Sequence, residues 1–155
     1  VECGRRKEVI TRMKLNHDCM RDCLLYLESV NNIHISIDMD ELDISLAPIF
    51  IETMFDDMTS WTNHDILYAL FNLEQGGYIN ASKQDSDNGI NIFCVNYITL
   101  QGHELLDSIR DDDRWKGIKK GLDAIRNYSL SAINAIADGM MTGAISAYLS
   151  QKTGA

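Results

Sequence analysis

The chain has 155 residues, of which 45% are hydrophobic and 24% are charged, and its formal net charge is −9. This length and composition are typical of one globular domain. The negative charge opposes nonspecific attraction to nucleic acid or to an anionic membrane surface. No N-terminal apolar run resembles a signal peptide, and no run approaches the ~18 uninterrupted apolar residues of a membrane span. We therefore expect a cytoplasmic protein with no membrane partner.

Residues 1–12 hold four basic and two acidic residues, unlike the acidic remainder of the chain. Two interpretations stay open. The segment is a translated leader ahead of a natural start at Met13, because a purine-rich ribosome-binding run can encode Lys7–Val9 and an alternative start codon can encode Val1. Alternatively, it is a flexible basic arm of the kind that reaches into DNA grooves.

The next part of the chain predicts a helix, a short strand and a second helix. The first helix, capped by Asn16 or Asp18, runs through about Val30 with apolar residues at helical spacing. Three isoleucines then alternate over residues 33–37 like a short strand. The segment that follows has no clear pattern until residues 54–61, which we expect to form the short second helix of a helix-turn-helix.

A third helix and a hairpin come next. Ile66, Leu70 and Leu73 share one face of a helix that Asn63 can cap. One of the two glycines at positions 76 and 77 supplies the left-handed residue that ends it. Beyond the glycines, Tyr78-Ile79 and the β-branched and aromatic run over residues 90–98 read as two strands, joined by turn-forming residues 85–89.

This order of elements predicts the fold class. A helix-turn-helix followed by a two-stranded wing is a winged helix, so we expect an α+β, mainly α protein with a winged-helix core over residues 13–99. Three further helices are predicted, from Thr99 to about Arg110, from Asp111–Asp113 to about Arg126, and from Ser129 to about Ser150. This extension, residues 100–150, packs on the core or forms an oligomer interface.

One motif after the predicted wing suggests a family. Residues 101–112, QGHELLDSIRDD, followed by Trp115-Lys116, resemble the signature of an uncharacterised bacterial and phage family of short proteins with a predicted winged helix. The opening around Asp18 to Asp22 and the third helix are similar to the same family. The resemblance implies the fold and a phage or prophage setting, and it carries no established activity.

The third helix carries few residues suited to reading DNA. With its apolar face inward, the outward side chains that suit phosphate or base contacts are His64, Tyr68 and Asn72, and the wing adds one cation, Lys83. Leu67 and Phe71 form an exposed apolar patch unless the C-terminal helices cover them as core. Both readings stay open. The predicted partner-binding residues are His64, Leu67, Tyr68, Phe71, Asn72 and Lys83.

The last predicted helix has small residues at every fourth position, which lets another backbone approach closely. This face either forms a homodimer or packs within the chain, and both alternatives stay open. The residues of the predicted oligomer interface are Ser131, Ala135, Gly139, Gly143 and Ala147.

Metal and catalytic sites are not indicated. Cys19 and Cys23 lie one helical turn apart, but no CxxC pair supplies half of a zinc site. His103 and Glu104 are adjacent on a helix, so their side chains point apart, and no nucleophile motif or phosphate-binding loop accompanies them. We expect no metal, no cofactor and no enzymatic activity.

Two functions therefore remain. The first is a phage- or prophage-associated accessory protein that binds a host or phage protein. The second is a DNA-binding transcriptional regulator, which the fold favours by analogy and the net charge disfavours. In that second reading, the basic residues of segment 1–12 would add DNA contacts.

Overall fold

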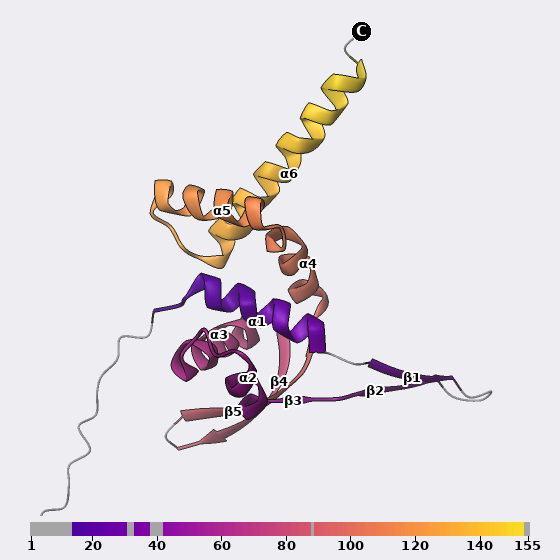
Figure 1. Cartoon of the computed structure of the whole chain (residues 1–155), viewed down its shortest axis with the longest axis vertical. Coiled ribbons are helices and arrows are strands. Elements are labelled where there is room, and N and C mark those ends of the chain that lie inside the picture. The colour runs from indigo at the N-terminus through magenta and orange to yellow at the C-terminus, as the bar shows by residue number, and fades with distance from the viewer. Residues whose placement is uncertain (1–13, 31–32, 38–41, 88, 154–155) are drawn as a thin grey trace, which may run out of the picture.

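The computed structural model describes residues 14–30, 33–37, 42–87 and 89–153 (Figure 1). It confirms an α+β, mainly helical fold in a winged-helix-like arrangement. The leader or arm predicted at residues 1–12 lies outside the described residues.

Three helices form the body with the wing. Helix α1 (His17–Val30) begins after Asn16, whose side chain accepts a hydrogen bond from the backbone N–H of Cys19 at 3.1 Å. Helices α2 (Ile51–Asp57) and α3 (Asn63–Gln75) follow it. Buried residues of α1, α2 and α3 belong to one continuous core, which includes Leu24, Met54 and Leu70.

Two predictions about these helices were wrong in detail. Helix α2 covers residues 51–57 and not 54–61, because it starts directly after a strand and buries Ile51 and Met54 together. Helix α3 is capped by Thr62 and not by Asn63: the Thr62 hydroxyl accepts a hydrogen bond from the backbone N–H of Asp65 at 3.2 Å. Both residue types are good N-caps, so composition alone did not separate the neighbours.

The wing contains a third strand that the sequence did not reveal. Strands β4 (Ile79–Ser86) and β5 (Gly89–Ile98) form the predicted antiparallel hairpin, and β3 (Ile49–Phe50) pairs with the other side of β5. The two-stranded wing is therefore a three-stranded sheet in the order β3-β5-β4. A strand of two residues is too short to show alternation, which explains why it was missed.

The end of α3 and the start of α4 (Leu100–Ile109) are joined at the base of the wing. Gly77, with φ of 76°, is the left-handed residue. The Thr99 hydroxyl donates to the carbonyl oxygen of Gly77 at 2.5 Å and accepts from the N–H of Gly102 at 3.1 Å, which caps α4. The Thr99 N–H donates to the carbonyl oxygen of Tyr78 at 3.1 Å. One residue thus links the helix-to-wing turn to the C-terminal helices.

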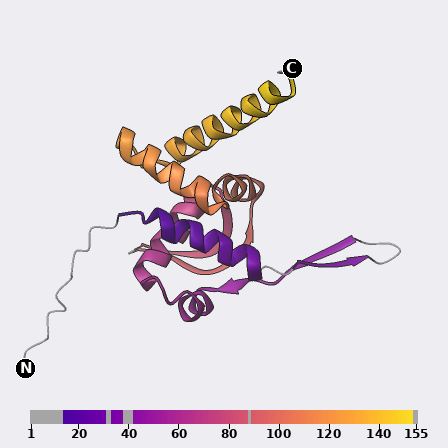
Figure 2. The same ribbon diagram turned by 45° about the horizontal axis from the view of Figure 1, so that its top comes forward.

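A second hairpin projects from the body. The predicted strand at residues 33–37 is confirmed as β1 (Ile33–Ile37), and it pairs with β2 (Leu42–Leu46), which was not predicted. The two strands form their own two-stranded sheet, in which Ile33 lies opposite Leu46. Figures 1 and 2 both show this hairpin extending away from the helices.

The C-terminal helices pack against α1 and against one another. Helix α5 (Asp112–Ile125) is capped by Asp111, as predicted, and α6 (Leu130–Thr153) begins directly after Ser129. The first part of α6 buries Ala132, Ile133 and Ala137, and the helix then leaves the body (Figure 1). Among the described helices, none combines the length and apolar character of a membrane span.

Candidate partner-binding groove

A groove lies between α3 and the wing. It has a volume of about 350 Å³ and is lined by Leu67, Tyr68 and Phe71 of α3 and by Ile90, Asn91 and Ile92 of β5. The rings of Tyr68 and Phe71 are stacked, with centroids 6.4 Å apart and planes 13° apart. The structure therefore brings three of the predicted partner-binding residues together on one mostly apolar surface.

The exposure of these side chains varies across the groove. Leu67 is 36% exposed and Ile90 is 45% exposed, whereas Ile92 is buried at 7%. Tyr68 and Phe71 are half-buried, and Phe71 packs against the core. The sequence left open that the C-terminal helices cover this face of α3. In the structure, β5 of the wing lines the face instead, and it leaves Leu67 and Ile90 partly exposed.

The shape of β5 explains how it reaches α3. The register of β4 against β5 shifts twice, between Asn80 and Ala81 and between Ser82 and Lys83. Each shift leaves an extra residue on β5, and such bulges bend a strand and increase its twist. The Asn96 side chain supports the first shift, because its amide donates to Asn80 at 2.8 Å and to Ser82 at 3.0 Å.

Two polar residues predicted for the site are already engaged within the chain. The Lys83 ammonium lies 3.0 Å from the Glu74 carboxylate, which comes from the last turns of α3. The side-chain amide of Asn72 donates to the backbone carbonyl oxygen of Tyr68 at 2.8 Å, one turn back on the same helix. His64 lies exposed in the first turn of α3 and does not line the groove.

Acidic side chains of the wing rim one side of the groove. Asp85 of β4 lies directly opposite Ile90 in the hairpin register. Asp87, in the turn of the wing, is exposed. The surroundings therefore combine apolar contact area with negative charge, a combination that repels phosphate.

The residues that resemble the family signature have a structural role. Arg21 of α1 donates to the carbonyl oxygens of Ile109 at 2.7 Å and Arg110 at 2.6 Å, and it pairs with Asp112 at 2.8 Å. It thus binds the C-terminal carbonyls of α4, where a cation is favourable. Arg110 itself pairs with Glu28 in the last turn of α1.

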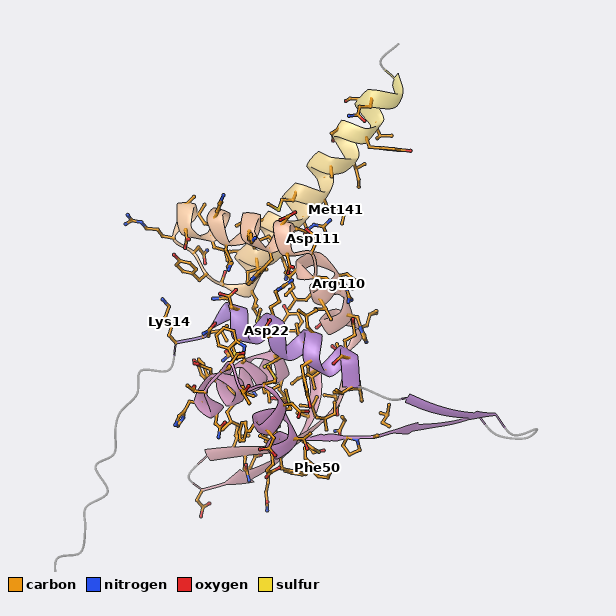
Figure 3. The ribbon with its side chains drawn as sticks, in the orientation of Figure 1. Lys14, Asp22, Phe50, Arg110, Asp111 and Met141 are labelled. Atoms are coloured by element: carbon orange, nitrogen blue, oxygen red, sulfur yellow. The ribbon has the colours of Figure 1, made fainter. Side chains whose placement is uncertain are left out.

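The polar contacts of Arg21 and Arg110 form a polar seam along α1, and two tryptophans extend it. The indole N–H of Trp115 donates to Asp18 at 2.8 Å, and that of Trp61 donates to Asp22 at 2.9 Å. Figure 3 labels Asp22 on α1 and Arg110 beside this helix. Arg110, Asp112 and Trp115 of the motif therefore help to fix α1 against its neighbours.

Gly102, the glycine of the same motif, is required for steric reasons. A Cβ atom at Gly102 would lie 1.9 Å from the carbonyl oxygen of Tyr78, an approach that no side chain permits. His103 and Glu104, which follow it, are both exposed. Any larger residue at position 102 would push α4 away from the base of the wing.

The small residues predicted as an oligomer interface lie on the surface of α6. Ser131, Ala135 and Ala147 are exposed, and a Cβ atom at Gly139 or Gly143 would meet nothing within 4 Å. Packing of these two glycines within the chain, one of the two alternatives, is therefore not found among the described residues. The dimer stays a prediction.

Two glycines of α5, rather than those of α6, lie where α5 and α6 approach each other closely. A Cβ atom at Gly117 would lie 2.5 Å from the Met140 methyl carbon, and one at Gly121 would lie 3.0 Å from Ile136. These two glycines let the start of α6 pack closely on α5. Within the chain, the small residues that bring these two helices together therefore belong to α5.

Thiols and metal ligands offer no second site in the part of the chain that is described. Cys19 and Cys23 are fully buried in the core. A hydrogen bond to Cys19 and burial both raise the pKa of the Cys23 thiol well above its ordinary value, so it is poorly nucleophilic. No group of three or more His, Cys, Asp or Glu side chains is placed to hold a metal ion within the described ranges.

Comparisons with known proteins give a family. A family model described as "Hypothetical protein (DUF2513)" matches residues 14–128. The chain belongs to this family. A protein named "Uncharacterized protein" from Haemophilus influenzae strain Rd is 33% identical to it over 135 residues, which cover 84% of this chain and 97% of the relative. No solved structure matches the chain significantly.

The membership confirms the resemblance to a family of unknown function. The matched range includes α1 to α5 and ends two residues before α6 begins. The groove and the polar seam along α1 therefore both lie within the DUF2513 region. The phage or prophage setting stays a prediction.

Proposed function

We propose that this DUF2513 protein is a non-enzymatic accessory protein, acting in the cytoplasm in a phage or prophage setting, that binds a host or phage protein through the groove between α3 and the wing. The observation that carries the proposal is the apolar lining of this groove by Leu67, Phe71 and Ile90. In a winged helix that reads DNA, polar and basic side chains would occupy this surface.

The charges near the groove support a protein partner. Lys83 is held by Glu74, so this cation is not available to phosphates without breaking an ion pair. The acidic rim and the net charge of −9 add repulsion toward any polyanion. Desolvating the half-buried rings and the exposed leucine favours association with another apolar surface.

The same features define the chemistry of the partner. A groove with a few apolar side chains in a row accepts an amphipathic helix or an extended segment that inserts two or three apolar anchors. Asp85 and Asp87 favour Lys or Arg beside those anchors, on the side of the wing. The partner segment thus combines apolar anchors with basic residues at the end that meets the wing.

Quantitative affinity purification from host cells tests the proposal. The baits are the wild-type chain, the groove variant Leu67→Asp and a control, Leu100→Asp, in which an equally apolar residue, 75% exposed at the start of α4, gains the same charge. We expect a protein that is enriched by the wild type and by Leu100→Asp and that is lost with Leu67→Asp. Thermal unfolding of all three baits verifies that they fold.

A second measurement addresses the DNA-binding alternative, which the winged-helix-like arrangement itself favours. Fluorescence anisotropy with pooled DNA fragments, including the gene's own upstream region, is measured at low and physiological salt. We expect no saturable binding. Binding that survives physiological salt and weakens in His64→Ala and Lys83→Gln would overturn the protein-binding proposal and establish the regulator.

A further inference from the structure

The part of α6 beyond the body projects into solvent and carries exposed apolar side chains. Residues 138–151 are all exposed, and they include Met141 at 46%, Ile145 at 53% and Leu149 at 55%. Figures 1 and 2 show this part pointing away from the remaining helices, and Figure 3 labels Met141 on it. Apolar side chains this large and this exposed, gathered on one helix face, are typical of an interaction surface.

Five residues on this part of α6 have a spacing that is the same when it is counted from either end. Asp138, Met141, Ile145, Leu149 and Lys152 follow one another at intervals of 3, 4, 4 and 3 residues, which places them on one face. Ile145 is the midpoint of this series. The two charges at its ends are opposite, and they are the charged residues of α6.

We propose that two copies of this chain pair through this face of α6 in an antiparallel, two-fold symmetric dimer centred on Ile145. In that arrangement, Met141 lies opposite the partner's Leu149, and Asp138 lies opposite the partner's Lys152. A two-fold interface requires a self-complementary surface, and the series supplies one in both shape and charge. A parallel pairing would place like charges together.

The position of the face on α6 leaves room for the second copy. Helix α5 packs on the opposite side of α6, through contacts of its glycines with Ile136 and Met140. The apolar part of the proposed face, from Met141 to Leu149, therefore points away from α5, and Asp138 lies at its base beside α4. Because α6 carries one acidic and one basic residue in a chain of net charge −9, its pairing brings together two helices without net charge.

This interface differs from the face of small residues predicted from the sequence. Gly143 and Ala147 lie toward the side of α6 that faces α5, by helical spacing from Ile136 and Met140. The two faces make opposite predictions for substitutions two residues apart. Ile145→Asp disrupts the proposed dimer, whereas Ala147→Asp disrupts a dimer formed through the small residues.

Sedimentation velocity of the full chain from micromolar to millimolar concentration tests the proposal. We expect a reversible monomer–dimer equilibrium, because the interface is one projecting helix. Ile145→Asp should raise the dissociation constant by about tenfold or more, as expected at the centre of an interface. Ala147→Asp is the matched control and should leave it unchanged. Both positions are exposed, so neither substitution affects the folded body.

A charge swap tests the direction of pairing. Asp138→Lys alone should weaken the dimer, and the double variant Asp138→Lys/Lys152→Asp should restore it, because the antiparallel arrangement exchanges the two charges. A monomer at every concentration would overturn the proposal and leave the face to another protein. Disruption by Ala147→Asp alone, or a swap that fails to restore pairing, would also overturn it.

Discussion

Trp115 on α5 donates its indole N–H to the carboxylate of Asp18 on α1 across 2.8 Å, and Lys119 pairs with the same carboxylate at 3.0 Å. Burial alone would raise the pKa of Asp18, but the hydrogen bonds from Trp115 and Lys119 outweigh burial and hold the pKa below its ordinary value. The first and fifth helices are thus joined by a contact that depends on an ionised carboxylate.

This contact predicts a pH dependence of stability. Because the folded-state pKa is lowered, the contribution of Asp18 is fully present above the ordinary Asp pKa of about 4 and is lost as the pH falls through the lower, folded-state value. Urea unfolding between neutral and acidic pH should show this loss in the wild type. In Asp18→Asn the corresponding part of the pH dependence should disappear; an unchanged profile would contradict the assignment.

Removing the donor tests the same contact from the other helix. Trp115→Phe keeps most of the buried ring and removes the N–H, so we expect a loss of about 1–2 kcal/mol in the free energy of unfolding. The double variant with Asp18→Asn should cost less than the sum of the two single variants. Additive costs would show that the hydrogen bond contributes nothing.

Tyr26 predicts a change at alkaline pH. Burial and a hydrogen bond to Asp57 at 2.6 Å raise the pKa of the Tyr26 hydroxyl to about 12. The stabilising effect is therefore present below the ordinary Tyr pKa of about 10 and is lost as the pH rises toward about 12. Chemical denaturation over this range should show the loss in the wild type, and Tyr26→Phe should remove it.

Gly102 and Gly143 form a matched pair of substitutions. Gly102→Ala forces a methyl group against the Tyr78 carbonyl and should destabilise the protein by about 3 kcal/mol or more. Gly143→Ala adds a methyl group in open space on a helix and should not lower stability, because Ala is the better helix former by about 1 kcal/mol. Thermal unfolding of both variants measures the difference. Equal melting temperatures would contradict the close approach of α4 to the wing.

The projecting hairpin predicts tolerance to deletion. Ile33 and Leu46 lie opposite each other, and β1 and β2 form a separate sheet from the wing. Replacing residues 34–45 by Asn-Gly should therefore leave the free energy of unfolding within about 0.5 kcal/mol, since shortening a loop changes closure entropy only slightly. Denaturation of the shortened chain measures this. A large loss would show that the hairpin supports the core.

Sequence reasoning succeeded where one element carried its own signal. Ile66, Leu70 and Leu73 predicted α3 from their spacing, and the glycine pair after them marked the passage into the wing. The short strand β3 and the start of α2 were missed, because their limits depend on pairing with β5 and on burial rather than on a local pattern.

The sequence identified the α3 side of the candidate groove but not the β5 side. Leu67, Tyr68 and Phe71 were identified from the face of α3 that they share, but Ile90 and Ile92 join them only through the register and bulges of β5. The ion pair between Lys83 and Glu74 links a strand to a helix, and the sequence alone does not show it. Counting the cations of the wing therefore overestimated how available Lys83 is to a partner. Helical spacing finds one wall of a groove, and only tertiary structure supplies the other.

The bonds made by Thr99 set the mechanical character of the wing. Its hydroxyl and its backbone N–H tie the turn after α3 to the first turn of α4, and Gly102 lets the two come into direct contact. The wing therefore cannot swing at its base without uncapping α4. The groove between α3 and β5 is therefore preorganised. A molecule that docks there loses its own conformational freedom, whereas this chain needs little rearrangement.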